Sequence, residues 1–347
     1  MRAVLRAHVP SGICLAVGIA VIAVLPSFMG AFETRNMSQV GLYFIALLGL
    51  NIVTGYSGQI SLGQGAFMGV GGYTTAYFAF EHGWNVWATV PVAAALAGVA
   101  GLLFGIPALR LHGPYLALGT FALAVAFVDL VRSDRFVDVT GGAQGLFFGL
   151  PEAPYYETWG IALGALLVAW LLLAGKLGRA LKAVRDAELA AVSSGLNPAV
   201  FKTLAFALSA AYAGVAGALL AIHLGSVNAL VFVPLLSITL LVGTALGGFG
   251  LLFGTMVGAL FIQYAPLKAE EWVNDLGLRD ICVGGTCLDM PPPTSVTYGV
   301  FLLIVLFVMP GGAAQLVLRL RGLLRRATKR GYTRPTVGEG ATTRSDS

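Results

Sequence analysis

The feature that most constrains this chain is a series of ten mostly apolar stretches separated by short polar segments. They lie at about 11–30, 38–55, 61–80, 86–107, 115–131, 157–175, 202–222, 232–247, 250–266 and 297–310. A helix needs roughly 20 apolar residues to cross a bilayer, so the shorter stretches fit half-helices or tilted helices. Only 11% of the residues are charged, against about 25% in soluble domains. We therefore predict an all-α, polytopic membrane protein with about ten transmembrane helices.

Basic residues gather on one side of the predicted topology, as the positive-inside rule describes for cytoplasmic segments. Arg2 and Arg6 precede the first stretch, and further basic clusters occupy 176–202 and 319–334. The loops at 132–156 and 267–296, which fall on the opposite side, carry more acidic than basic residues. Both termini are therefore expected in the cytoplasm, and the net charge of +5 indicates topology rather than a nucleic-acid partner.

We divide the chain into a transmembrane domain, residues 1–318, and a basic cytoplasmic tail, 319–347, whose polar end is expected to be disordered. The apolar run near the N-terminus is longer than that of a signal peptide, so it is interpreted as a retained first span. In the extracytoplasmic loop, Cys282 and Cys287 could form a disulfide if that loop faces an oxidising compartment. The four histidines are scattered along the chain, so no metal site is expected.

The segment 51–77 combines many glycines with uncharged polar residues, and it contains no Lys, Arg, Asp or Glu. Polar side chains at membrane depth are costly unless they meet partners or line a wet cavity. A helix broken at the glycines would offer backbone N–H groups and carbonyls to a zwitterion without any ionised side chain. The alternative is a helix-packing face with interhelical hydrogen bonds. The candidate residues of a translocation path are Asn51, Tyr56, Ser57, Gln59, Ser61 and Gln64.

A second informative segment lies between the spans that end near 175 and begin near 202. It has the composition of a short, mixed-charge cytoplasmic helix at about 180–197, ended by Gly195. Such a helix can dock into a groove of a partner protein, although an ordinary positive-inside loop is the alternative. The candidate docking residues are Arg185, Asp186, Glu188 and Gly195.

These two segments resemble the permeases of branched-chain amino acid ABC importers, in particular those of the LivM type. The family pattern G-Y-S-G-Q-x-S-L-G-x-x-x-F is matched from Gly55 to Phe67. Its coupling-helix pattern, Arg-x-x-Glu-x-Ala-Ala-x-x-x-Gly, is matched from Arg185 to Gly195. Further similarity extends the resemblance to about residues 38–312.

The resemblance implies the permease fold of an ABC importer in the inner membrane of a bacterium, with branched-chain or related amino acids as cargo. It implies four kinds of partner besides membrane lipid: a LivH-like second permease, two cytoplasmic ATPases, an extracytoplasmic binding protein and the amino acid itself. No cofactor is implied. The sequence departs from the family pattern at Leu251 and at Gly254-Thr255, which leaves the substrate open.

Two other classes of membrane protein are alternatives. An ion-coupled secondary transporter of small polar solutes usually carries an ionisable residue inside a span, and only Asp129 and His223, both near span ends, qualify here. An intramembrane enzyme would need a catalytic motif, and neither H-E-x-x-H nor G-x-S-x-G occurs. The sequence also lacks a phosphate-binding loop, so ATP hydrolysis is expected in partner chains. An ABC permease for an amide or small carboxylate remains a further alternative.

Overall fold

The structure is a computed structural model that describes residues 22, 24–111, 113–142, 144–149, 155–275, 281–283, 286–288 and 299. Five of the described helical segments are long and apolar enough to cross a membrane: Ala31–Tyr56, Val86–Ala108, Pro114–Arg132, Tyr155–Ala174 and Pro198–Leu224. Together with the helices Gln64–Glu81, Pro234–Gly247 and Gly254–Asp275 they correspond in order to eight of the ten predicted spans. The prediction of an all-α membrane protein is therefore confirmed for the described residues. Most of the first span, nearly all of the tenth and the tail at 319–347 lie outside them.

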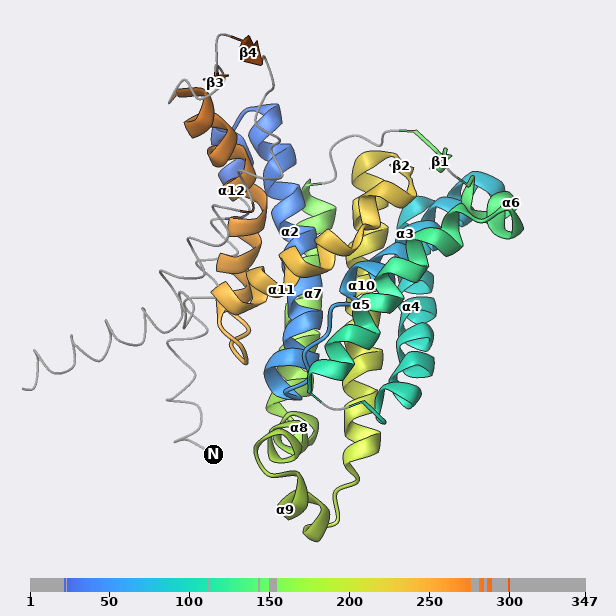
Figure 1. Cartoon of the computed structure of the whole chain (residues 1–347), viewed down its shortest axis with the longest axis vertical. Helices are drawn as coiled ribbons and strands as arrows, with labels where there is room; N and C mark the ends of the chain where they lie inside the picture. The colour runs from blue at the N-terminus through green and yellow to red at the C-terminus, as the bar shows by residue number, and fades with distance from the viewer. Residues whose placement is uncertain are drawn as a thin grey trace, which may run out of the picture.

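The elements follow one another with short connections (Figure 1). They are η1 (Leu25–Phe28), α2 (Ala31–Asn51), η2 (Ile52–Tyr56), α3 (Gln64–Glu81), α4 (Val86–Ala108), α5 (Pro114–Arg132), η3 (Asp134–Phe136), α6 (Val137–Thr140), β1 (Leu146–Phe147), α7 (Tyr155–Ala174), α8 (Lys176–Asp186), α9 (Glu188–Ser193), α10 (Pro198–Leu224), β2 (Ser226–Val227), η4 (Ala229–Phe232), α11 (Pro234–Gly247), α12 (Gly254–Asp275), β3 (Ile281–Val283) and β4 (Thr286–Leu288).

Local sequence signals set several helix ends. The side chains of Asn85 and Asn197 accept hydrogen bonds from the backbone N–H groups of Trp87 and Ala199, each at 3.0 Å, and so cap α4 and α10. α10 ends at Gly225, whose φ of 67° is the left-handed conformation that favours glycine. α12 begins near its predicted position but continues to Asp275, past the predicted span end at 266. The residues that extend it, Ala269 to Glu271, are good helix formers.

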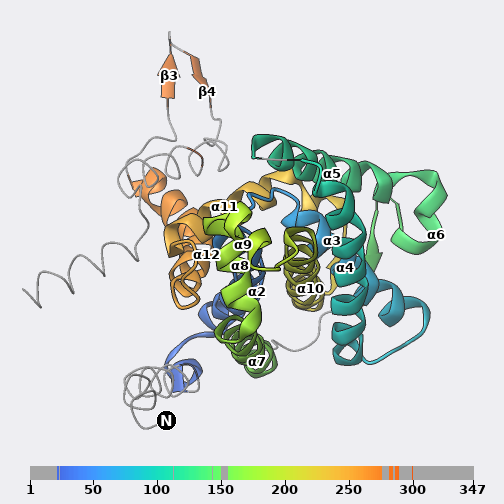
Figure 2. The same ribbon diagram turned by 90° about the horizontal axis from the view of Figure 1, so that it is seen from below.

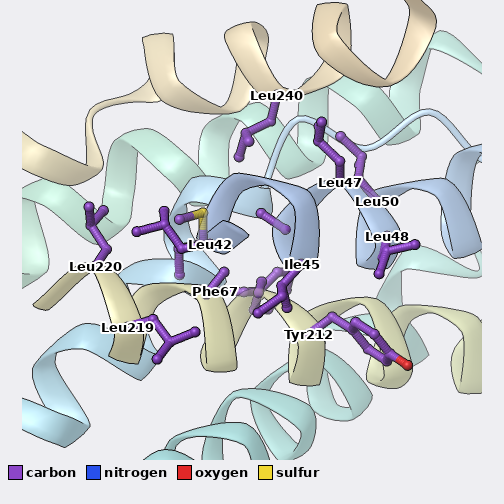
Figure 3. Packing of buried hydrophobic residues seen from close by; sticks show 14 of the residues in the cluster. Leu42, Ile45, Leu47, Leu48, Leu50, Phe67, Tyr212, Leu219, Leu220 and Leu240 are labelled. Carbon is purple, nitrogen blue, oxygen red and sulfur yellow. The ribbon is translucent and has the colours of Figure 1, made fainter. Parts of the chain in front are cut away.

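The centre of the bundle is formed by α2 and α10. In the most apolar window of each span, 83% of the α2–η2 residues and 78% of the α10 residues are buried, against 33% for α4, α5 and α7. Figure 3 shows side chains of α2, including Leu42 and Ile45, packed between α10 and α11. The outer helices instead present large apolar side chains such as Leu103, which is 64% exposed. This exposure fits a surface whose solvent is lipid.

Glycine allows α3 and α10 to approach backbone to backbone. A Cβ atom added at Gly71 would lie 2.1 Å from the carbonyl oxygen of Gly214, so the two helices could not keep their present separation with any larger residue there. Small residues at such crossings let transmembrane helices gain van der Waals contact without a hydrophobic driving force. The crossing fixes α3 against the central helix of the bundle.

The two ends of the bundle differ. α8 and α9 lie together at one end, whereas α6 and both small sheets lie at the other (Figure 1). Figure 2 looks onto the end that carries α8 and α9. In one sheet β1 pairs antiparallel with β2, and in the other Cys282 of β3 lies opposite Cys287 of β4 in the strand register. The basic segment at 176–202 thus lies at the opposite end of the bundle from the described parts of the acidic loops at 132–156 and 267–296. The disulfide itself stays a prediction.

The α3–α10 crossing makes a testable prediction. Gly71→Ala should lower the thermal midpoint of the detergent-purified protein, because overpacking of a tight contact costs about 1–3 kcal/mol. Gly164→Ala is the matched control, since a Cβ there meets nothing within 4 Å. Size-exclusion profiles recorded after heating to a series of temperatures would give the thermal midpoint of each variant. Equal midpoints for the two variants would contradict the close crossing.

Candidate functional site

The chain leaves helical geometry at the end of α2 and re-enters it inside the bundle. α2 ends in a π-helical turn, η2, and Gly58 then takes a φ of 75°, which turns the chain back. The next helix starts only at Gln64, whose side chain donates a hydrogen bond of 3.1 Å to the carbonyl of Ala46. A rise of about 1.5 Å per residue places Ala46 about 15 Å along the helix from Tyr56, half of the ~30 Å hydrocarbon layer. α3 therefore begins beside the middle of α2, inside the bundle, rather than at the level where α2 ends.

Protein groups replace the hydrogen bonds that a continuous helix would have supplied across this break. The N–H groups of Ser57 and Gln59 donate to the carbonyls of Ile52 and Val53, each at 3.1 Å. The N–H of Leu62 donates to the hydroxyl of Thr120 on α5 at 2.8 Å. Unpaired backbone groups at membrane depth cost several kcal/mol each, so such partners are required for the break to exist.

The start of α3 meets the start of α11. The N–H of Gly65 donates to the hydroxyl of Ser237 at 2.9 Å, and both residues are fully enclosed. From this contact α3 runs toward the end with the small sheets, and α11 runs obliquely toward the end with α8 (Figure 1). Two helix N-termini, each the positive end of a helix dipole, therefore lie side by side within the bundle.

A second break separates α11 from α12 and is tied to the first. The side chain of Asn51 accepts a hydrogen bond of 2.7 Å from the N–H of Gly250 and donates one of 3.2 Å to the carbonyl of Leu251. Gly55 packs directly on the same loop, because a Cβ at Gly55 would lie 2.4 Å from the Gly250 nitrogen. The ends of α2 and α11 thus form one junction.

The six predicted path residues differ in what their side chains contact. Asn51 is fully buried and bridges the two breaks. Gln64, 1% exposed, donates to Ala46 on α2 and accepts from the hydroxyl of Ser209 on α10 at 3.1 Å. Both amides hold helices together. Ser61 is also buried, and its hydroxyl accepts a bond of 3.4 Å from the N–H of Gly63.

The other three predicted residues lie around the turn itself. The ring of Tyr56 has the ammonium of Lys182 at 5.0 Å from its centroid, a cation–π contact. Within the described part of the chain, the buried hydroxyl of Ser57 and the side-chain oxygen of Gln59 have no hydrogen-bond partner. The hydroxyl of Thr54 is likewise buried and unpartnered there. These groups therefore have hydrogen-bonding capacity that the described residues do not use.

An open cleft of about 500 Å³ adjoins the turn. Most of its lining is apolar, and the charged side chain at its edge belongs to α8. The lining residues are Thr54, Gly55, Ile60, Arg185, Leu241, Val242, Ala245 and Phe249. Ile60 lies on the broken segment and is 49% exposed. The cleft is thus bordered by the non-helical segment, and irregular backbone of this kind is not left facing lipid.

The predicted coupling helix at about 180–197 is two short helices, α8 and α9. Ala187, with φ −155° and ψ 86°, is extended and separates them. After α9, the N–H of Leu196 donates to the carbonyl of Ala191 at 3.0 Å across Gly195, whose φ is 80°. This is a Schellman motif, and it explains why a glycine stands at this position.

The four predicted coupling residues occupy different positions on this unit. Arg185 donates a hydrogen bond of 2.6 Å to the carbonyl of Gly55, and its Nε lies 2.8 Å from the carboxylate of Asp186. The carboxylate of Glu188 is paired with the ammonium of Lys202 at 2.7 and 2.8 Å, which ties α9 to α10. α8 therefore touches the helix break directly, and α9 is held beside it.

Sequence reasoning missed the partners that stabilise the breaks. Thr120, Ser209 and Ser237 come from three other helices, and the carbonyl of Gly55 is a backbone group. Isolated Ser and Thr residues in apolar helices commonly bond to their own helix, as Thr244 does with Leu240, so their type carries no long-range signal. Only the three-dimensional arrangement identifies them.

A low-charge helical bundle with two helix breaks that meet inside it has the architecture of a membrane transport subunit. The comparisons with known proteins agree. A family model described as "Branched-chain amino acid transport system / permease component" matches residues 34–309. The chain therefore belongs to this family of transport permeases, which confirms the resemblance inferred from its motifs.

Two curated relatives carry the same description, "High-affinity branched-chain amino acid transport system permease protein LivM". The one from Escherichia coli (strain K12) is 34% identical over 235 residues, which cover 58% of this chain and 55% of that protein. The one from Salmonella typhimurium (strain LT2) is also 34% identical over 235 residues, covering 57% and 54%. The chain thus spans about half the length of the curated relatives it matches. No solved structure matches it.

Cysteine labelling tests whether the broken segment faces water. In a chain freed of its three native cysteines, Ile60→Cys should react with a water-soluble maleimide, because a hydrated thiol ionises and the thiolate is the nucleophile. Leu103→Cys, on the outer face of α4 and at least as exposed in the isolated chain, should stay unmodified in the bilayer. Equal labelling of the two positions in membrane vesicles would contradict a water-lined break.

Proposed function

We propose that this chain is a membrane-spanning subunit of an ATP-driven importer that moves branched-chain or related amino acids across the cytoplasmic membrane by alternating access. One observation carries the proposal. The carbonyl of Gly55, a residue that precedes the helix break and lines the open cleft, accepts a hydrogen bond from Arg185 of α8. This contact supports a direct link between the proposed solute site and the proposed cytoplasmic driving element. Family membership supports the same reading.

The chemistry around the breaks suits a zwitterion with an apolar side chain. The adjoining N-termini of α3 and α11 favour a carboxylate, because the positive ends of two helix dipoles meet there. Carbonyls released from helical bonding can accept hydrogen bonds from an ammonium group. The cleft offers apolar contacts through Leu241, Val242 and Ala245. In this proposal the solute loosens the Gly65–Ser237 hydrogen bond when it binds between the two helix starts.

The second permease is proposed to cover the face that carries residues 57–63. Gly58 and Ile60 are exposed there although they lie in a non-helical segment at membrane depth. Irregular backbone is tolerated at that depth only against protein or a water-filled cavity. A partner permease on this face would enclose the cleft between the two subunits. It would thereby complete a path that this chain alone leaves open on one side.

The ATPases are proposed to dock at α8 and α9. Leu189 and Val192 on α9 are 86% and 52% exposed, at the end of the bundle that carries the basic segment. This end is proposed to be cytoplasmic, together with both termini, by the positive-inside rule. Two ATPases would bind there, one on each permease. The substrate-binding protein would deliver cargo at the opposite end, where α6 and the sheets lie.

Ion-coupled transport is a second candidate that a specific observation favours. The buried hydroxyls of Thr54 and Ser57 lack hydrogen-bond partners within the described residues, and hydroxyls and carbonyls are the groups that bind Na⁺ in transporters. A sodium site at the break would drive uptake without ATP. An amide or small carboxylate in place of an amino acid is compatible with the same helix N-termini.

Reconstitution with the partner chains tests the proposed function. The complex purified from native membranes should contain a second permease and two ATPase chains. In proteoliposomes with the binding protein it should accumulate leucine, isoleucine or valine only when ATP is supplied to the ATPase side. Uptake that follows a sodium gradient and ignores ATP would establish the ion-coupled alternative instead. ATP-dependent accumulation of a carboxylate or amide, but of no amino acid, would show that the proposed cargo is wrong and that the proposed ATP-driven mechanism is right.

The proposed docking surface makes its own prediction. Leu189→Asp should strip the ATPases from the purified complex, because an exposed apolar residue at the centre of an interface tolerates a buried charge poorly. Leu189→Met, which keeps the apolar volume, should retain them. The side chain is largely free of contacts within this chain, so both variants should fold alike and elute as single species. ATPases that stay bound to the aspartate variant would place the docking surface elsewhere.

A further inference from the structure

The guanidinium of Arg185 occupies the point where α8 meets the end of α2. One of its nitrogens donates a hydrogen bond of 2.6 Å to the carbonyl of Gly55. Its Nε is held at 2.8 Å by the carboxylate of Asp186, which fixes the direction of the planar group. The side chain lies so close to Gly58 that a Cβ there would be 2.6 Å from the Arg185 Cγ. The contact therefore involves the break on both sides of Tyr56.

The hydrogen bond from Arg185 to the Gly55 carbonyl belongs to the stronger hydrogen bonds that a backbone carbonyl can accept. The last carbonyls of a helix lack intrahelical partners and form the negative end of its dipole, so a cation placed there is stabilised. Hydrogen bonds from charged donors exceed neutral ones in their net contribution. The π-helical turn at Ile52–Tyr56 is thus held in part by a side chain from another element.

The same turn is bound to the second break. Asn51, one helical turn before Gly55, bridges Gly250 and Leu251 through both atoms of its amide. Gly55 and Gly250 are in backbone contact, and Gly250 lies near the Arg185 guanidinium, with the position of an added Cβ 3.9 Å from its Nη1. A displacement of the Gly55 carbonyl would therefore act on the α11–α12 loop as well as on the segment that leads to α3.

We propose that Arg185 is a positioning residue that acts as a latch: its hydrogen bond to Gly55 transmits movement of α8 and α9 to both helix breaks. This inference rests on the proposed function and deepens it, because it assigns Arg185 to contact within the chain rather than to the ATPase surface. When the ATPases shift α8, the latch shifts the π-helical turn. The junction of Asn51, Gly55 and Gly250 carries that shift to the start of α12.

Loss of the latch should uncouple the two reactions of the complex. Arg185→Gln keeps a side chain of moderate length but cannot supply a charged donor held by Asp186. The complex should assemble and hydrolyse ATP, while solute accumulated per ATP hydrolysed falls about tenfold or more, as expected for the loss of a charge-assisted hydrogen bond. Arg179→Gln is the matched control: it removes the same charge from the same helix, where Arg179 donates a hydrogen bond of 3.4 Å to the carbonyl of Ala174 at the end of α7.

A second variant disturbs the latch from the opposite side. Gly58→Ala should push the Arg185 side chain away without altering any charge or the surface of α9. It should reproduce the uncoupling of Arg185→Gln in the assembled complex. Gly83→Ala controls for backbone strain, because Gly83 has a φ of 59° and a Cβ there meets nothing within 4 Å.

The outcomes separate the latch from the proposed function. If the wild-type complex shows no ATP-driven uptake, the proposed function fails and the latch fails with it. If the wild-type complex transports and both variants keep its uptake per ATP, the latch alone is overturned. If Arg185→Gln loses the ATPases during purification while Gly58→Ala transports normally, Arg185 belongs to the docking surface and not to a latch. Uncoupling in both variants, with intact complexes and normal controls, supports the proposal.

Discussion

Backbone groups that leave helical hydrogen bonding inside a membrane must find partners within the protein, and the arrangement of this bundle depends on how they do so. The chain is interrupted after α2 and again after α11. Side chains from other elements hold the interruptions: Thr120 from α5, Ser237 from α11 and Arg185 from α8, with Asn51 between the two breaks. In water these hydrogen bonds would contribute little, because water could replace each partner. In hydrocarbon each partner offsets the cost of an unpaired backbone group, which is several kcal/mol. The helices that supply these partners are thereby fixed around the breaks.

The constraint distinguishes two kinds of contact in the molecule. α2, α10 and the glycine-lined α3 crossing form a closely packed centre with few polar groups. The breaks instead depend on a few hydrogen bonds, which can be exchanged for others at small net cost when a solute or water enters. In the proposed function, solute binding and movement of α8 converge on the same residue, since Gly55 lines the cleft and its carbonyl accepts the hydrogen bond from Arg185. This convergence is what coupling between distant chains requires.

Much of the fold could be predicted because its signals are local. Apolar length located the spans, and the polar glycine-rich composition of 51–77 located the first break. The matched motif located the helical segment that α8 and α9 form. The residue pairs could not be predicted, because Gln64 with Ser209 and Asn51 with Gly250 are joined only by the packing of helices far apart in sequence. For the same reason the sequence could not distinguish a path-lining amide from one that ties helices together.

The segment 176–197 illustrates the same limit on a smaller scale. Its composition and final glycine predicted one docking helix, and the structure has two, because Ala187 is extended between them. Nothing in the residue type of Ala187 indicates a break. The contacts that accompany it are tertiary: Arg185 reaches the end of α2 before it, and Glu188 pairs with Lys202 after it.

The central claim is that the face carrying residues 57–63 lines a solute path and is closed by a second permease. An experimental structure of the complex, purified with its partners and embedded in a lipid nanodisc, tests it most directly. We expect protein from the second permease against this face, with water or solute density in the cleft beside Ile60 and the Gly55 carbonyl. Ordered lipid chains packed along residues 57–63, with the partner permease on another face, would contradict the account.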